Sequence, residues 1–252
     1  MLDRDIEELA ALVQKARRAV VFTGAGISTE CGIPDFRSPG GFWTRNKPIE
    51  FRDFLASEET RREAWRRFFG VYDSLSAARP GPSHTAVAEL VHRGHVAHVI
   101  TQNIDGLHES AGIAADRIVE LHGNGTYAAC LSCGLRHELA WARIEIEDRD
   151  RTPACTACGG IVKSATISFG QAMPDQPMAD ARAATLNADL FLALGSSLQV
   201  FPAAGFPVMA TQNRTPLVII NREPTGLDGL AHMVVRAELG QVLPDLVGRL
   251  AP

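Results

Sequence analysis

The chain lacks the features that would assign it to a membrane or to a nucleic acid. None of its apolar runs reaches the roughly 18 residues that a membrane-spanning helix needs. Its 252 residues carry 25 Lys and Arg against 29 Asp and Glu, so the net charge is -4 and the basic surface of a nucleic-acid-binding protein is missing. A mildly acidic surface suits a basic partner instead, such as a lysine-bearing peptide. We expect no membrane and no direct nucleic-acid partner.

An export signal and internal repeats are also missing. The first residues, MLDRDIEELA, are acidic and amphipathic, unlike a signal or transit peptide. Cysteine is scarce, with five residues, and four of these form two CxxC pairs. In a chain without an export signal, such pairs indicate reduced thiols and a metal. We expect a cytoplasmic protein, long enough for one large domain with an insertion or for two modest domains.

A short strand followed by two glycines is the first candidate for ligand binding. The apolar run at 19–23 predicts a buried strand, and Gly24 and Gly26 follow directly. Such a turn lets the backbone approach a ligand and presents free N–H groups to phosphate. Thr29 stands where the GxGxxG dinucleotide fingerprint has its third glycine, so a plain tight turn is the alternative. A loop beside the turn either contacts the ligand or is merely solvated, and it carries Asp35, Phe36 and Arg37.

Strand-like runs alternate with helical patterns along the rest of the chain. Apolar spacing predicts helices over 3–17, 57–77 and a closing segment from Val242. We expect Ser83 to cap one further helix and Pro202 to begin another. Segment 38–56, rich in Pro, Gly and aromatic residues, is either a mobile lid or a packed irregular connection. Further strands are predicted at 96–101, 117–121, 190–194, 217–220 and 232–235. The alternation predicts an α/β fold with a parallel sheet.

Polar loops follow several of these predicted strands. TQNIDGLH begins at the end of 96–101, His122 follows 117–121, and GSS follows 190–194. In open α/β sheets, ligands bind at the carboxyl ends of the strands, so these loops are candidates for one site. Taken singly, His122 is more simply a hydrogen-bonded histidine, and GSS is more simply a turn.

The two CxxC pairs predict a zinc site. Cys130 with Cys133 and Cys155 with Cys158 are separated by 21 residues, a spacing typical of four-thiolate zinc. Four thiolates complete a tetrahedral shell, so the metal should be structural and should hold together a module too small for its own core. Disulfides or free thiols are the alternative. Cys31 stands apart and is interpreted as a small buried residue.

Together these segments resemble one family, the sirtuins, which are NAD-dependent protein lysine deacylases. The matching segments come in family order over nearly the whole chain: GAGIS at 24–28, GIPDFR at 32–37, TQNIDGLH at 101–108, ELHG at 120–123, both CxxC pairs and GSSLQVFPAA at 195–204.

The resemblance implies a Rossmann-like parallel sheet domain that binds NAD, with a smaller lobe made of a four-cysteine zinc module and a helical module. It divides the chain into an NAD-binding domain over 1–37, 84–123 and 171–252, a helical module with a lid-like loop over 38–83, and a zinc module over 124–170. It implies NAD as co-substrate, one structural zinc ion, and an acyl-lysine protein or peptide as partner.

The resemblance also implies roles for individual residues. His122 would be the general base that deprotonates a ribose hydroxyl, a task that suits an imidazole with an ordinary pKa of about 6.5. Asn103 would share in catalysis. Close positioning of the two substrates could supply much of the acceleration. NAD contacts would come from the glycine turn and its loop and from three further strand-end segments: Gly24, Ala25, Gly26, Asp35, Phe36, Arg37, Gln102, Asn103, Ile104, Asp105, Gly195, Ser196, Ser197, Asn221, Arg222 and Glu223. The peptide would pair with Thr166, Ile167, Ser168, Phe169 and Gly170.

The sequence departs from the family pattern in three places. Ser164, Thr166 and Gln171 replace a proline, an aliphatic residue and a glutamate in the peptide-pairing strand, which should still pair through its main chain. Leu239 stands where the family has a small residue beside the adenine. Phe68 and Val71 occupy the positions of the Tyr-x-x-Arg pair found in sirtuins that favour succinyl or malonyl lysine. We therefore expect acetyl or longer apolar acyl groups, although Arg66 and Arg67 lie close by in sequence.

Two other functions stay open at this point. Mono-ADP-ribosyl transfer from NAD to a protein would use the same pocket. A non-catalytic NAD-binding regulator would recruit partners through the zinc module.

Overall fold

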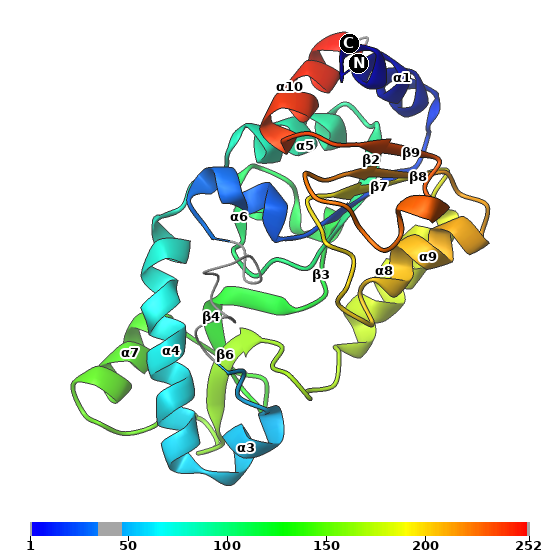
Figure 1. Cartoon of the computed structure of the whole chain (residues 1–252). Coiled ribbons are helices and arrows are strands. Elements are labelled where there is room, and N and C mark those ends of the chain that lie inside the picture. The colour runs from blue at the N-terminus through cyan, green and yellow to red at the C-terminus, as the bar shows by residue number, and fades with distance from the viewer. Residues whose placement is uncertain (1, 35–46, 251–252) are drawn as a thin grey trace.

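A six-stranded parallel sheet forms the large lobe of the computed structural model, which describes residues 2–34 and 47–250 (Figure 1). The strand order is β3-β2-β1-β7-β8-β9, and every neighbouring pair is parallel. The strands are β1 (Ala19–Thr23), β2 (Val96–Thr101), β3 (Ile118–Glu120), β7 (Leu190–Leu194), β8 (Leu217–Ile220) and β9 (Met233–Val235). All residues of β1, β7 and β8 are buried, as expected of strands covered on both faces.

Helices cover both faces of this sheet. On one face lie α1 (Leu2–Lys15), α5 (Pro82–His92) and α10 (Leu239–Arg249), whose apolar residues share a core with β1 and β7. On the other face lie α8 (Asp175–Asn187) and α9 (Gly205–Gln212), packed over a second core (Figure 1). Strands β2 and β3 lie on one side of β1, and β7, β8 and β9 lie on the other, so the strand order reverses beside β1. In such sheets a crevice opens at that point, outside the carboxyl ends of the strands.

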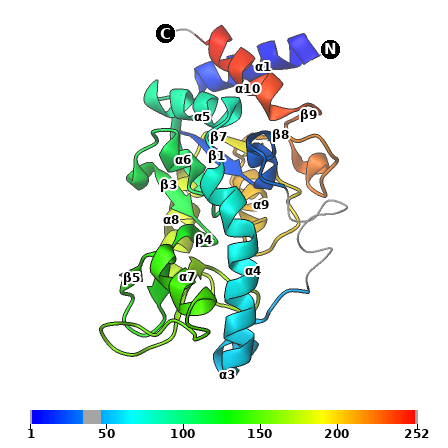
Figure 2. The same ribbon diagram turned by 90° about the vertical axis from the view of Figure 1, so that its left-hand side faces the viewer.

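The smaller lobe combines a short antiparallel sheet with a helical part. Its strand order is β5-β4-β6, with β4 (Gly123–Cys130), β5 (Arg136–His137) and β6 (Val162–Thr166). Figure 2 shows the long helix α4 (Glu58–Ala77) running alongside α7 (Leu139–Glu147). Trp65 and Phe69 of α4 are buried against residues of α7, β4 and β6. The short helix α3 (Phe51–Ala56) precedes α4. The predicted α/β class with a smaller lobe is confirmed.

Several short helical elements follow strands of the large sheet. The 3-10 helix η1 (Ala25–Cys31) follows β1, and α6 (Leu107–Ser110) and η2 (Ala115–Arg117) lie between β2 and β3. The 3-10 helix η3 (Asp228–Leu230) precedes β9. In the part of the chain that the structure describes, no helix combines the length and the apolar character needed to cross a bilayer.

Two expectations about helix starts are wrong. Helix α5 begins at Pro82 with Gly81 as its N-cap, so Ser83 lies inside the first turn and caps nothing. The cap comes instead from Glu30, whose carboxylate accepts a 2.7 Å hydrogen bond from the Ser83 main-chain N–H. Pro202 does not begin a helix either, because α9 starts three residues later at Gly205. Helix α3 lies within segment 38–56, whose first nine residues fall outside the described residues.

Candidate active site and metal centre

One cleft of about 770 Å³ lies where the carboxyl ends of the parallel strands face the smaller lobe. Residues from the strand ends of the large lobe meet residues of α4 and β6 there. Of the residues predicted to act in catalysis or to contact NAD or the peptide, all those described line this cleft: Gly24, Ala25, Gly26, Gln102, Asn103, Ile104, Asp105, His122, Thr166, Ile167, Ser168, Phe169, Gly170, Gly195, Ser196, Ser197, Asn221, Arg222 and Glu223. Asp35, Phe36 and Arg37 lie outside the described residues.

The two glycines of the turn after β1 allow a close approach between two strand ends. A Cβ atom at Gly24 would lie 2.8 Å from Cβ of Ser196, and one at Gly26 would lie 2.7 Å from Cα of Gly195. The main-chain N–H groups of Gly24 and Gly26 donate to the carbonyls of Leu194 and Gly195, at 3.1 and 2.8 Å. The expectation that this turn offers free N–H groups is therefore wrong for these two residues. Their lack of a side chain lets the turn after β1 pack against the turn after β7.

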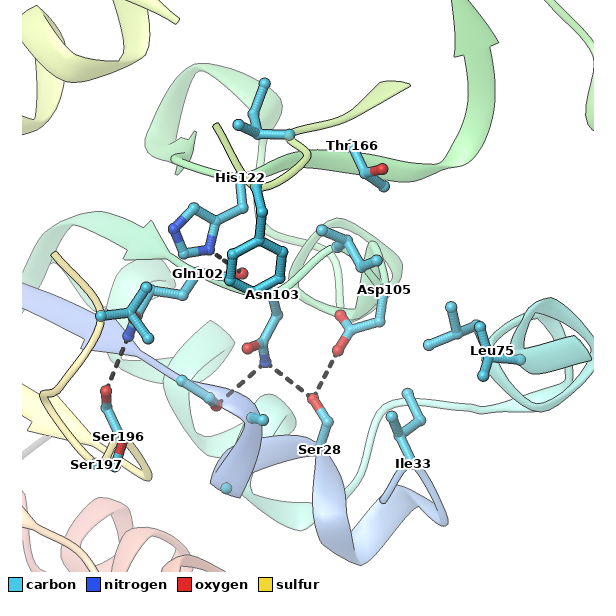
Figure 3. Close-up of a pocket in the computed structure, with 18 of the residues that line it drawn as sticks. Ser28, Ile33, Leu75, Gln102, Asn103, Asp105, His122, Thr166, Ser196 and Ser197 are labelled. Atoms are coloured by element: carbon cyan, nitrogen blue, oxygen red, sulfur yellow. Dashed lines mark hydrogen bonds between the residues drawn. The ribbon is translucent and has the colours of Figure 1, made fainter. Parts of the chain in front are cut away.

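A hydrogen-bonded network joins η1 to the loop after β2 (Figure 3). The Asn103 amide group donates to the Ser28 hydroxyl at 3.1 Å and to the Gly24 carbonyl at 3.2 Å. The Ser28 hydroxyl donates in turn to the Asp105 carboxylate at 2.7 Å. These bonds fix the Asn103 and Asp105 side chains on the floor of the cleft. Ser28 is almost fully buried and was not among the predicted site residues.

Gln102 extends the network toward β7. Its side-chain amide donates to the Ser196 hydroxyl at 2.9 Å, and the same hydroxyl accepts the Leu198 N–H at 3.3 Å. The serine loop after β7 and the loop after β2 are therefore held together across the end of β1. The contact between Gln102 and Ser196 therefore fixes the part of the cleft that these two loops line.

The geometry of His122 defines its tautomer. Nδ1 lies 3.0 Å from the main-chain carbonyl oxygen of Gln102. Because a carbonyl oxygen can only accept, Nδ1 carries the hydrogen and Nε2 of the neutral ring carries the lone pair. An imidazole oriented in this way can take up a proton at Nε2. Figure 3 shows the ring beside the Gln102–Asn103 segment.

Glu120, two residues before His122, has an unusual protonation behaviour. Burial is the main cause that raises its pKa from its ordinary value of 4.5 to about 7, while a 2.8 Å hydrogen bond from the Asn124 side chain opposes that rise. The negative charges of Glu109 and Asp105 add to the increase in pKa. This carboxyl group therefore changes charge near neutral pH.

The end of β6 and the loop after it form the opposite wall of the cleft. The Ile167 N–H donates to the His122 carbonyl at 2.8 Å, which ties this wall to the loop that carries the histidine. The hydroxyls of Ser164 and Thr166 lie 2.9 Å apart and both residues line the cleft. The Phe169 carbonyl accepts the Phe51 N–H at 2.8 Å.

Apolar side chains of α4 close the inner part of the cleft. Phe68, Val71 and Leu75 line it together with Ile33 of the segment after η1. Arg67 also lines the cleft, but its guanidinium group donates to Glu63 at 2.6 Å and to the Lys47 carbonyl at 2.8 Å. The inner wall is therefore predominantly apolar.

The four cysteines of the two CxxC pairs form one cluster. Their sulfur atoms all lie within 4.8 Å of one another. The Cys130–Cys158 and Cys133–Cys155 Sγ distances are 3.5 and 3.6 Å, too long for disulfide bonds, which are about 2.05 Å. Four sulfurs bound at about 2.3 Å to a tetrahedral zinc ion lie about 3.8 Å apart, so the cluster fits this metal. The disulfide alternative is wrong.

Comparison with known proteins decides the family. The family model described as "Sir2 family" matches residues 24–202. The chain belongs to the Sir2 family. It is 54% identical to "NAD-dependent protein deacetylase 1" of Bradyrhizobium diazoefficiens over 96% of this chain and 95% of that protein. It is 51% identical to "NAD-dependent protein deacetylase" of Rhodopseudomonas palustris over 98% of each chain.

A solved structure described as "Sir2-p53 peptide-NAD+" has the same fold as this Sir2-family chain. Its TM-score is 0.87 at 30% sequence identity, and the match covers 96% of this chain and 97% of the other. Ser28 lies within GAGIS, one of the segments that carry the resemblance. That motif was the signal that could have added Ser28 to the predicted site.

Proposed function

We propose that this Sir2-family chain is an NAD-dependent protein lysine deacylase whose chemistry depends on His122 and Asn103. The reaction consumes acyl-lysine, NAD and one water molecule, and it releases nicotinamide, an O-acyl-ADP-ribose and free lysine. The observation that carries the residue assignment is the placement of the His122 ring, with its Nε2 lone pair, in the same cleft as the Ser28–Asn103–Asp105 network.

The cleft fits a dinucleotide in size and in chemistry. Its volume of about 770 Å³ lies in the range of small-molecule sites, roughly 300 to 1,000 Å³. Its lining contains small residues at two strand ends and the polar side chains of Gln102, Asn103 and Asp105. We propose that Gly24, Gly26, Ser196 and Ser197 lie along the diphosphate. Asn221, Arg222 and Glu223, at the end of β8, would lie beside the adenosine. Bound NAD supplies the ribose carbon that the acyl oxygen attacks.

His122 acts as a proton acceptor in this proposal. Its Nδ1–H is held by the Gln102 carbonyl, so Nε2 takes the proton from a ribose hydroxyl. Asn103 and Asp105 position the nicotinamide carboxamide, and Ser28 positions both of these side chains. None of these groups needs to move far, because their hydrogen bonds already hold them in place.

The acyl-lysine peptide lies between the two lobes. We propose that its main chain pairs with Thr166–Gly170 and that its acyl group reaches the apolar wall of Phe68 and Val71. We also propose the domain boundaries given by the sequence, with the NAD-binding domain over 1–37, 84–123 and 171–252, the helical module over 38–83 and the zinc module over 124–170. The zinc ion is structural, since four thiolates complete its shell.

A single reaction tests the activity. The purified protein is incubated with NAD and an acetyl-lysine peptide, and the products are analysed by mass spectrometry, with NAD omitted as the control. Release of nicotinamide together with O-acetyl-ADP-ribose supports the proposal. ADP-ribose attached to protein, without deacetylated peptide, would show mono-ADP-ribosyl transfer instead. No nicotinamide release from any acyl-lysine peptide would favour a non-catalytic regulator.

A further inference from the structure

Three metal-ligating side chains meet behind the cleft, outside the site described above. Glu30 and Cys31 lie at the end of η1, and His84 lies in the first turn of α5. A carboxylate oxygen, the Cys31 sulfur and a ring nitrogen of His84 all lie within 4.8 Å of one another. We call these three residues the Cys31 cluster. From the sequence alone, Cys31 is interpreted only as a small buried residue.

The separation of two of these atoms matches a shared metal ion. Cys31 Sγ and His84 Nδ1 lie 3.6 Å apart. A tetrahedral zinc ion with a Zn–S bond of about 2.3 Å and a Zn–N bond of about 2.05 Å holds its sulfur and nitrogen about 3.6 Å apart. A direct thiol–imidazole hydrogen bond is the structural alternative for the same distance.

Hydrogen bonds deeper in the core define the tautomer of His108, the histidine that lies against His84. The Thr23 hydroxyl donates to Thr101 at 2.8 Å, so it must accept from His108 Nε2 at 2.9 Å. His108 Nδ1 then carries a lone pair, consistent with burial and the neighbouring His84, which lower the pKa of His108 to about 3. The His84 and His108 rings lie 5.1 Å apart between centroids.

Each histidine of this pair has one buried ring nitrogen without a hydrogen-bond partner among the described residues. These are His84 Nε2 and His108 Nδ1. His84 itself has no exposed surface. A water molecule between an N–H on His84 Nε2 and the lone pair of His108 Nδ1 would satisfy both nitrogens and would be the kind of support that metal-bound histidines usually have. It leaves the Nδ1 lone pair of His84 for a ligand beside Cys31.

We propose that the Cys31 cluster binds a soft divalent metal ion such as Zn²⁺ or Co²⁺. On binding, the Cys31 thiol loses its proton to solvent and forms a metal–sulfur bond, while His84 Nδ1 and a Glu30 oxygen donate electron pairs. One thiolate and one carboxylate balance the charge of the ion, so the metal-bound site is neutral, whereas the metal-free site carries the single negative charge of Glu30. Burial raises the pKa of the Cys31 thiol, so without metal it is not an activated nucleophile.

The site is connected to the cleft by packing and by charge. Cys31 and Ile104 both pack against the small core of Ile33, Leu75 and Leu107. The Asp105 charge acts on both Cys31 and His84. Since a bound ion adds positive charge beside Asp105, it opposes the cationic nicotinamide ring. We therefore infer, on the basis of the proposed function, that the metal weakens the use of NAD.

Cobalt is the probe that tests the site. Co²⁺ is added to protein that retains one equivalent of zinc, because Co²⁺ binds such ligands more weakly than Zn²⁺ and leaves the four-cysteine site occupied. We expect a second metal equivalent with a sulfur-to-cobalt charge-transfer band. C31S removes this band and weakens binding at least about tenfold. E30Q weakens binding while its amide oxygen can still cap α5, and the matched control H92Q on the same helix changes nothing.

Each outcome decides one part of the proposal. A band that persists in C31S, or wild-type protein that takes up no second equivalent, overturns the metal site. If C31S fails to fold, E30Q with normal circular dichroism and unchanged affinity overturns it as well. Separately, Co²⁺ should lower kcat/KM for NAD about fivefold or more in wild-type protein but not in C31S. Equal sensitivity of both proteins overturns the link to the cleft, and the spectroscopic result is independent of the proposed function.

Discussion

Ser28 and Asp105 lie 77 residues apart in the chain, yet the Ser28 hydroxyl donates a 2.7 Å hydrogen bond to the Asp105 carboxylate. The same hydroxyl accepts a hydrogen bond from the Asn103 amide. One buried side chain therefore positions both residues that we assign to the nicotinamide pocket. It links the first strand end of the sheet to the second.

Replacing Ser28 should separate positioning from folding. A hydrogen bond to a charged group contributes about 1.5–3 kcal/mol, so we expect S28A to lower kcat/KM about tenfold to a hundredfold. Steady-state kinetics with acetyl-lysine peptide measure this, and circular dichroism at the assay temperature should show that the fold is retained. S76A, which removes a serine hydroxyl on exposed α4 surface, is the matched control. Activity of S28A within twofold of wild type would contradict the assignment.

Replacing His122 tests the proton acceptor. Removing a general base typically costs 10²- to 10⁴-fold in rate, so we expect H122A to lower kcat by that order while NAD still binds. Single-turnover kinetics and NAD titration measure the two properties on the same sample. H92A on α5 should be as active as wild type. Retained turnover in H122A would remove the role we give this ring.

Removing zinc should disrupt the smaller lobe alone. Cys130 and Cys155 belong to the core that also contains Trp65 and Phe69, so that core loses its cross-link when the metal leaves. We expect chelation to expose the zinc module to proteolysis and to abolish activity, with recovery after zinc is restored. Metal content is verified by elemental analysis. Full activity in metal-free protein would rule out a structural ion.

Glu120 should make stability depend on pH. Its folded-state pKa of about 7 exceeds its ordinary value of 4.5, so the folded state keeps a proton that the unfolded chain loses between these values. Stability from this group is present below pH 4.5 and falls as pH rises toward 7. The shift corresponds to at most about 3 kcal/mol, and to about 1–2 kcal/mol for a partly exposed side chain.

Urea unfolding measures the effect of this carboxyl group. We expect E120Q to be more stable than wild type at pH 8 by about 1–2 kcal/mol, with a smaller difference at pH 5.5. The amide oxygen can still accept from Asn124, so this contact is kept. E59Q, at an exposed position of α4, is the matched control and should show no such pH dependence. Parallel pH profiles of E120Q and wild type would contradict the raised pKa.

The acyl preference should follow the apolar wall. Phe68 and Val71 present no cation to a distal carboxylate, so we expect acetyl- and longer apolar acyl-lysine peptides to react faster than succinyl peptides. A peptide panel with NAD measures kcat/KM for each. The double variant F68Y/V71R should raise the succinyl rate relative to the acetyl rate. A wild-type preference for succinyl peptides would contradict this prediction and would indicate that Arg67, which also lines the cleft, binds the distal carboxylate.

Most elements could be predicted from the sequence because their patterns are strong and local. The apolar runs of β7 and β8, the largely apolar run of β1 and the aromatic spacing of α4 needed no tertiary information. Helix α8 was not predicted, since its buried residues are Ala181 and Thr185, and such small or polar side chains give little hydrophobic periodicity. The cap of α5 was predicted wrongly, because the capping carboxylate of Glu30 comes from 53 residues away.

The sequence by itself determined the sheet, the zinc ligands and the strand-end loops, since these depend on residue type and spacing along the chain. Only the tertiary structure decided how those loops contact one another. It showed that the glycines make room for a neighbouring strand end and that the His122 tautomer is set by a carbonyl of another loop. It also brought Cys31 beside His84. These relationships are distances between segments remote in sequence, and they exist only once the apolar core has brought the strands together.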